Sequence, residues 1–219
     1  MLACPTRCPA CGGRGRTLAT LDQAVVEGPA RDDDLASGTA GLLIATFLSF
    51  ALEGLFPGYR YCFWLYGPQV LNGQWWQLVT SLFLHSTLLQ LGFNTAALYA
   101  FGAPLENALG TRRFVALYLG AGVAGNLLSL VFHPRIQSVG ASGCIFGIAG
   151  AWIGIQVRRP LFSGRVIMAL IAYVAFALLS GFAADAALNN LAHLGGFVVG
   201  VAGGLAMAPS AQPEEERFS

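Results

Sequence analysis

The sequence predicts an all-α, polytopic membrane protein built as a bundle of six transmembrane helices. Two observations lead to this fold class. Hydrophobic residues make up 55% of the chain and charged residues only 11%, a balance far from that of an ordinary soluble domain. The apolar residues also form long runs that fill most of the chain from about residue 38 to residue 207. We therefore expect the lipid bilayer to be its main surrounding.

Six apolar runs have roughly the length that a membrane helix needs. A hydrocarbon core about 30 Å thick takes roughly 20 residues of α-helix. The runs cover approximately residues 38–55, 78–101, 114–132, 142–157, 166–182 and 188–207. Polar or helix-ending residues follow the first three runs, at Pro57-Gly58, at Pro104 with Glu106, and at Pro134-Arg135. Residues 38–207 are therefore predicted to form one six-helix membrane domain.

Two polar segments flank this domain. Residues 208–219 form a polar, acidic C-terminal tail, and residues 1–37 form an N-terminal segment with a cysteine cluster and a linker. The cluster contains Cys4, Cys8 and Cys11, and the last two have the spacing of a zinc knuckle. A tetrahedral zinc site takes about four ligands. The cluster is thus either a partial or intermolecular zinc site or a remnant that binds no metal, and the sequence leaves both open.

The distribution of cations predicts the orientation in the membrane. All 12 basic residues are Arg, and Arg and Lys concentrate in cytoplasmic loops. With six spans both termini share one side, which carries every Arg except Arg60 and Arg135. We expect cytoplasmic N- and C-termini, with a bacterial inner membrane as the default location and an organelle membrane as the alternative. The first apolar run starts late and follows three consecutive Asp residues, so no cleavable signal peptide is predicted.

Few polar side chains lie at membrane depth, where they are costly and thus mark functional sites. They occur in the second, fourth and sixth spans, which all run from the outer side inward. These residues are His85, Gln90 and Asn94, then Ser142, and then Asn189, Asn190 and His193. Because they all fall in the outer halves of their spans, we expect them to converge at one depth.

The fourth span is too short to cross the membrane. About 16 residues at 1.5 Å each extend only about 24 Å, so the helix is expected to begin below the outer surface. Residues 139–141 would then be non-helical backbone at membrane depth, which is tolerated where it is buried or lines a wet cavity. This places Ser142 at a water-filled pocket.

Small residues recur at intervals of about four on the fourth and sixth spans, as they do where membrane helices pack closely. They are Gly143, Gly147 and Ala151 on the fourth span and Ala192, Gly196, Gly200 and Gly204 on the sixth. If these stripes face each other, Ser142 and His193 lie beside the same seam. A nucleophile and its base would meet there.

Three segments together carry a resemblance to a known family. They are Gly140-Ala141-Ser142-Gly143, the run Asn190-Leu191-Ala192-His193-Leu194-Gly195-Gly196, and the stretch from Trp75-Trp76-Gln77 through Leu84-His85 to Asn94. Leu105-Glu106 with Gly110 matches the turn that follows. Over roughly residues 59–206 the chain resembles the rhomboid intramembrane proteases. A serine motif of this kind is weak evidence alone, but its combination with the other two segments and six spans is specific.

The resemblance implies a serine–histidine dyad without a carboxylate, in which Ser142 attacks and His193 is the base. It implies an oxyanion site formed by the Ser142 backbone N–H, the Asn94 amide and a donor at Gln90, next to Gly140 of the serine motif. Phe146 matches an aromatic residue that packs against the histidine. His85 is expected either to hold the first loop or to contact the substrate. No metal or organic cofactor is implied.

Three positions depart from the family pattern. Gln90 stands where many members have a second histidine, so we expect retained but altered stabilisation of the oxyanion. Gln77 stands where Arg is common, which puts the usual packing of the first loop in doubt. Asn189 replaces a frequent Asp at a place remote from the proton chemistry. The nucleophile and base are both present.

The leading hypothesis is a serine endopeptidase that cleaves transmembrane segments of other membrane proteins, which enter sideways past the fifth span. An inactive rhomboid-like protein that binds membrane-protein clients is the alternative, which loss of the serine or histidine would favour. Apart from either function, Ser142 could be a close-packing residue, and His193, Gln90 and Asn94 could serve only to tie helices together. A channel or transporter needs an ionisable pathway, and Glu53 near the end of the first span is expected to be alone. No nucleic acid is expected among the partners.

Overall fold

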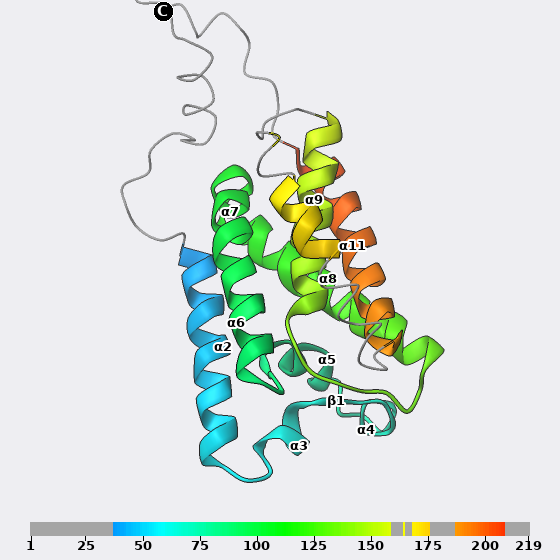
Figure 1. Cartoon of the computed structure of the whole chain (residues 1–219). Coiled ribbons are helices and arrows are strands. Elements are labelled where there is room, and N and C mark those ends of the chain that lie inside the picture. The colour runs from blue at the N-terminus through cyan, green and yellow to red at the C-terminus, as the bar shows by residue number, and fades with distance from the viewer. Residues whose placement is uncertain (1–36, 159–163, 165–167, 176–186, 209–219) are drawn as a thin grey trace, which may run out of the picture.

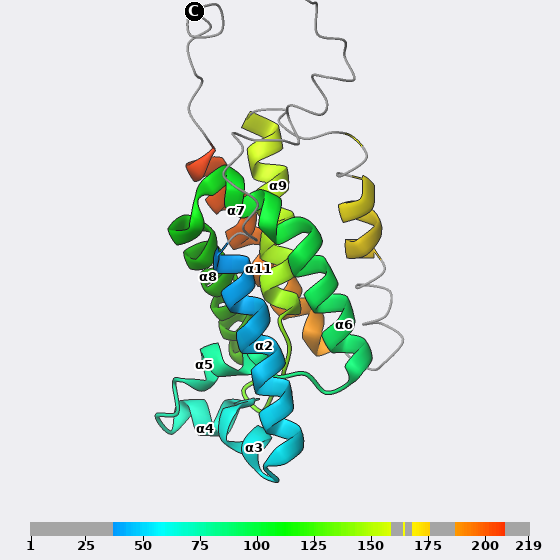
Figure 2. The same cartoon turned by 90° about the vertical axis from the view of Figure 1, so that its left-hand side faces the viewer.

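The computed structural model of this chain describes residues 37–158, 164, 168–175 and 187–208. Long helices run side by side in the described part, and the short elements between the first two of them gather at one end (Figures 1 and 2). The predicted all-α membrane bundle is thus confirmed. Cys4, Cys8 and Cys11, the C-terminal tail and much of the predicted fifth span lie outside the described residues.

Three of the described helices are long and apolar enough to cross a membrane. They are α2 (Ser37–Leu55), α8 (Thr111–Phe132) and residues Asn190–Met207 of α11 (Ala187–Met207), and they coincide with the predicted first, third and sixth spans. Helix α9 (Ser142–Arg158) has 17 residues and matches the short fourth span. Of the fifth span, residues 168–175 are described and helical. The protein is an integral membrane protein.

The second span begins later than the sequence predicted. A short helix α5 (Gln77–Thr80) and a 3-10 turn (Ser81–Phe83) come first, and residues 84–87 are not helical. Helix α6 (Leu88–Ala97) then starts behind Thr87, whose extended backbone and side-chain oxygen cap the helix by accepting from the Gln90 N–H. The prediction of one helix from residue 78 was wrong because apolar residues continue through this break. His85 therefore lies in a connection and not in a helix.

The second span also contains a local widening of its helix. A π-helical turn (Leu98–Gly102) joins α6 to α7 (Ala103–Leu109), and such turns disturb the regular backbone ladder. The indole Nε1 of Trp152 donates to the Phe101 carbonyl at 3.0 Å. This bond between α9 and the second span satisfies a backbone oxygen inside the bundle, where water is scarce.

Helix α9 occupies the middle of the bundle, packed against α8 and α11 (Figure 1). The predicted small-residue stripes do face each other. A Cβ atom on Gly196 would collide with the carbonyl oxygen of Gly143, one on Gly200 with that of Gly147, and one on Gly204 with that of Ala151. Only helices without side chains at these positions can approach so closely. The predicted seam is thus confirmed.

The elements at one end of the bundle form a small layer of their own. They are α3 (Tyr59–Phe63), β1 (Leu65–Tyr66), α4 (Gly67–Leu71) and β2 (Gln137–Ser138), and β2 pairs antiparallel with β1 in the register Leu65 to Ser138. Gln77 is fully buried among them. Its Oε1 accepts from the Tyr66 N–H at 3.1 Å, and its Nε2 donates to Gln69 Oε1 at 2.7 Å. The buried Gln77 side chain therefore links β1 and α4 of the first loop through hydrogen bonds.

A buried carboxylate ties three helices together near the start of α2. Glu106 of α7 is 2% exposed and accepts from the backbone N–H groups of Gly38 and Thr39, at 2.8 and 2.7 Å. It also accepts from the hydroxyls of Thr39 and Thr111. The negative charge thus satisfies free N–H groups at the positive end of α2. These bonds join α2, α7 and the beginning of α8.

Candidate functional site

Ser142 and His193 meet at one end of the seam between α9 and α11. Ser142 is the first residue of α9, and its Oγ lies 2.9 Å from Nε2 of His193. Their chain neighbours form the seam, because a Cβ atom on Gly143 would lie 3.3 Å from the Ala192 carbonyl oxygen. The glycine that follows the serine therefore brings the two helices, and with them the two side chains, within hydrogen-bonding distance.

An aromatic ring and the serine fix the histidine ring. Phe146, one turn after Ser142 on α9, stacks on His193 with 4.1 Å between ring centroids and 2° between ring planes. His193 is 5% exposed, and its Nδ1 has no hydrogen-bond partner in the described part of the chain. Among the described residues, no carboxylate accepts a hydrogen bond from His193 Nδ1.

Asn94 and His85 form a second polar pair beside the dyad. The Asn94 Nδ2 group donates to His85 Nε2 at 3.0 Å. His85 Nε2 must then be an acceptor, so the ring proton lies on Nδ1, which donates to the Phe83 carbonyl at 3.2 Å. The Tyr173 hydroxyl donates to Asn94 Oδ1 at 3.4 Å and supports this amide orientation. His85 is completely buried, which favours the loop-holding role over contact with substrate.

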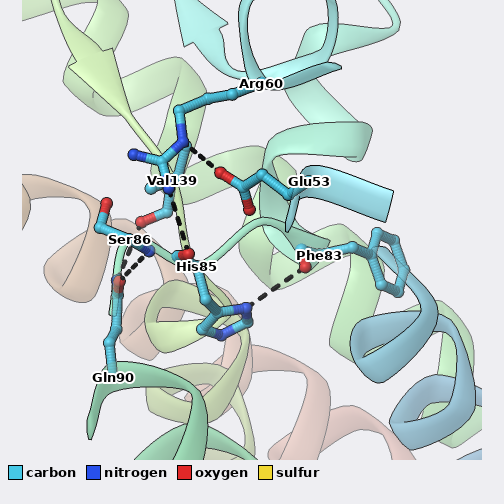
Figure 3. A network of polar contacts seen from close by, with 7 residues as sticks. All are labelled: Glu53, Arg60, Phe83, His85, Ser86, Gln90 and Val139. Carbon is cyan, nitrogen blue, oxygen red and sulfur yellow. Dashed lines mark hydrogen bonds and ion pairs between the residues drawn. The ribbon is translucent and has the colours of Figure 1, made fainter. Parts of the chain in front are cut away.

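The Gln90 side chain bridges two non-helical backbone segments of the site, one at Ser86 and one at Val139. Its Oε1 accepts from the Ser86 N–H at 2.8 Å, and its Nε2 donates to the Val139 carbonyl at 3.1 Å (Figure 3). It therefore connects the non-helical residues before α6 with the segment that leads into Ser142. Gln90 therefore holds these two segments together, and this structural role is separate from its proposed role as an oxyanion donor.

Gly140 lies directly against these amides. Its φ of 128° is one that residues with a Cβ rarely adopt, and a Cβ there would collide with Gln90 Nε2 and lie 3.8 Å from Asn94 Nδ2. Its N–H donates to the Ser81 carbonyl at 2.9 Å. Glycine thus lets the Gln90 and Asn94 amides lie close to the backbone just before Ser142, while the Gly140 N–H keeps that backbone anchored.

The structure therefore brings together all the predicted site residues among those that it describes: Ser142, His193, Asn94, Gln90, Gly140, His85 and Phe146. The weak metal candidates Cys4, Cys8 and Cys11 lie outside the described residues. Within the described part, no three His, Cys, Asp or Glu side chains gather around a possible metal position.

Two contacts of the site were missed at the level of sequence. Tyr173, from the predicted fifth span, bonds to Asn94 and packs its ring near that of Phe101, and an isolated Tyr in an apolar run gave no signal. Glu53, predicted to be alone, forms an ion pair with Arg60, so that prediction was wrong. The sequence did contain a signal for this pair. Arg60 is one of only two Arg residues expected on the outer side, and Glu53 lies near the outer end of its helix.

Comparison with known proteins agrees with this architecture. The family model of the rhomboid domain matches residues 72–210. The chain is 36% identical over 140 residues to the putative rhomboid protease YdcA of Bacillus subtilis, covering 61% of this chain and 70% of that protein. It is 32% identical over 201 residues to rhomboid-like protease 3 of Toxoplasma gondii, covering 85% and 74%.

A further relative is longer than this chain. Rhomboid protease GluP of Bacillus subtilis is 37% identical over 132 residues, which are 60% of this chain but only 26% of that protein. The similarity to GluP thus concerns a limited part of its length. Since the family model covers more than half of the chain and includes Ser142, His193, Asn94, Gln90, Gly140, His85 and Phe146, the chain belongs to the rhomboid family.

Proposed function

We propose that this protein is an intramembrane serine endopeptidase that cleaves transmembrane segments of other membrane proteins. The observation that carries the proposal is the 2.9 Å contact between Ser142 Oγ and His193 Nε2, inside a bundle that has three described helices long and apolar enough to cross a membrane. Relatives with 32–37% identity are named as rhomboid proteases, which supports the same activity here.

In this proposal His193 Nε2 takes the Ser142 hydroxyl proton while Oγ attacks the scissile carbonyl carbon. The tetrahedral intermediate then collapses, His193 returns the proton to the leaving amine, and an acyl-enzyme remains on Ser142. Water, deprotonated by the same histidine, hydrolyses that ester. Stacking on Phe146 keeps the ring in place for both proton transfers.

The developing negative oxygen needs donors that are already in position. A side-chain amide has two N–H groups. In Asn94 one of them is directed to His85 and in Gln90 one is directed to Val139, which leaves the second of each for the oxyanion. Together with the Ser142 backbone N–H, the Asn94 and Gln90 amides, which lie close to Gly140, would form the oxyanion site.

The substrate is proposed to be a membrane-spanning helix with Gly or Pro near the cut and a small residue before it. Such a helix unwinds at low cost, which exposes its carbonyl to Ser142. Entry past the fifth span requires the Tyr173–Asn94 contact to open.

We further propose one membrane domain at residues 38–207 between two polar segments, with both termini in the cytoplasm and a bacterial inner membrane as the location.

The test is labelling by a fluorophosphonate probe, which reacts with activated serines. Membranes that contain the wild-type chain, Ser142→Ala or His193→Ala are incubated with the probe. Labelling of the wild type alone supports the proposal. A folded wild type that admits the probe and remains unlabelled would refute it and favour an inactive relative that binds clients.

A further inference from the structure

An ion pair connects the first transmembrane helix to the first loop. Glu53 lies near the end of α2, and Arg60 lies in α3, on the other side of a turn at Gly58. The Arg60 Nε group donates to Glu53 Oε1. The Glu53 side chain is only 9% exposed, and its other oxygen has no hydrogen-bond partner in the described part of the chain. Arg60 is therefore the principal compensation for a buried negative charge.

The same arginine reaches the backbone of the proposed active site. Its Nη2 group donates to the carbonyl oxygen of His85 at 3.3 Å. Figure 3 shows Arg60 between the Glu53 carboxylate on one side and His85 on the other. The His85 ring in turn accepts from Asn94 at 3.0 Å. A series of hydrogen bonds thus connects Glu53 through Arg60 and His85 to Asn94.

We propose that Glu53 and Arg60 are positioning residues that set the geometry of the Asn94 donor through His85. The inference rests on the proposed function, because Asn94 is assigned there to the oxyanion. It deepens that function by adding a charged pair that none of the sequence motifs contains.

The local backbone explains why such a support is needed. Residues 84–87 are not helical, so no regular ladder of backbone bonds holds them. Side chains hold them instead, with Gln90 bound to the Ser86 N–H and Arg60 bound to the His85 carbonyl. A bond from a charged donor is stronger than one between neutral groups, and Glu53 keeps Arg60 directed inward instead of toward solvent. Loss of either charge would release the backbone that carries the His85 ring.

Three substitutions separate positioning from general stability. Arg60→Gln and Glu53→Gln each remove one charge. Arg60→Lys keeps the charge opposite Glu53, but a single ammonium cannot bind the carboxylate and the His85 carbonyl in the geometry of a guanidinium. Arg135→Gln is the matched control, because Arg135 is exposed and is expected on the same side of the membrane.

The first measurement is the rate of fluorophosphonate labelling per folded molecule in lipid vesicles. We expect labelling to slow by about tenfold in each of the three variants, the change that about 1.4 kcal/mol produces in a rate, and to stay unchanged in Arg135→Gln. In an Asn94→Ala background, Arg60→Lys should slow labelling no further, because the pair acts through Asn94. Slowing of equal size in that background would overturn the proposal, as would wild-type labelling in Arg60→Lys.

The second measurement does not depend on activity. The chain has 3 histidines, so ¹⁵N-histidine NMR of the Ser142→Ala protein gives a small set of ring signals, assigned by substituting each His in turn. Arg60→Lys should shift the His85 ring nitrogens and leave those of His133 unchanged. Unshifted His85 signals would overturn the positioning role. A wild type that does not label, with shifted His85 signals, would instead refute the proposed function while leaving the structural link intact.

Discussion

The seam between α9 and α11 gives the sharpest prediction about the site. Gly196→Ala places a methyl group against the backbone carbonyl of Gly143, the residue that follows Ser142. A backbone oxygen cannot rotate away as a long side chain can, so the two helices must separate. Gly41→Ala is the matched control, because Gly41 is also helical and a Cβ there would meet no atom within 4 Å.

The size of the effect follows from the contact. Gly→Ala in a helix interior gains up to about 1 kcal/mol in helix propensity, whereas overpacking costs about 1–3 kcal/mol. Gly196→Ala should therefore lower stability by up to about 2 kcal/mol, and Gly41→Ala should raise it. A separation of roughly 1 Å would take the 2.9 Å contact between Ser142 and His193 past the useful hydrogen-bond range. Misplacement of this size can slow a reaction by about 100-fold.

Two assays measure these effects on the same detergent-solubilised protein. Thermal unfolding reports stability, and fluorophosphonate labelling per folded molecule reports the geometry of Ser142 and His193. Gly196→Ala should unfold at a lower temperature and label slowly, while Gly41→Ala should unfold higher and label at the wild-type rate. The reasoning fails if Gly196→Ala behaves like Gly41→Ala in both assays.

Three further substitutions test individual contacts. Asn94→Ala should slow substrate cleavage about 100-fold or more, the usual effect of losing one oxyanion donor, and an unchanged turnover number would exclude that role. Phe146→Leu should slow labelling about fivefold, because an aromatic pair contributes about 0.5–1.5 kcal/mol, whereas the exposed Phe47→Leu should label normally. Glu106→Gln removes a buried charge that accepts four hydrogen bonds and should lower stability by about 2 kcal/mol, measured by thermal unfolding. Labelling per folded molecule should then stay at the wild-type rate, and a loss there would contradict a purely structural role.

Much of the bundle was predictable because the bilayer imposes simple rules on sequence. Length and hydropathy predicted α2, α8, α9 and α11 within a few residues, and the spacing of small residues predicted which helices pack together. The break at residues 84–87 was not predictable in this way. It depends on the cap at Thr87 and on side-chain bonds to backbone, which an average over apolar residues does not detect.

The sequence predicted which residues of the candidate site would lie near one another, but not their hydrogen-bond partners. Motifs identified Ser142, His193, Asn94 and Gln90, and the structure places them together. The partners of the amides depend on three-dimensional contacts between distant segments, such as Gln90 with Val139 and Asn94 with Tyr173. The Glu53–Arg60 pair was missed although both residues were expected near the outer side, because the polar groups were sought inside the spans and not across the turn that joins the first span to the first loop.

The central claim is that Ser142 and His193 cleave peptide bonds within the membrane. The most direct test reconstitutes the protein in lipid vesicles with a single-span model substrate that carries Gly and Pro in its helix, and maps the products by mass spectrometry. The wild type should cut inside the span, next to a small residue, while Ser142→Ala and His193→Ala leave the substrate intact. Cleavage that persists in either variant, or an intact substrate with the wild type, would contradict the claim.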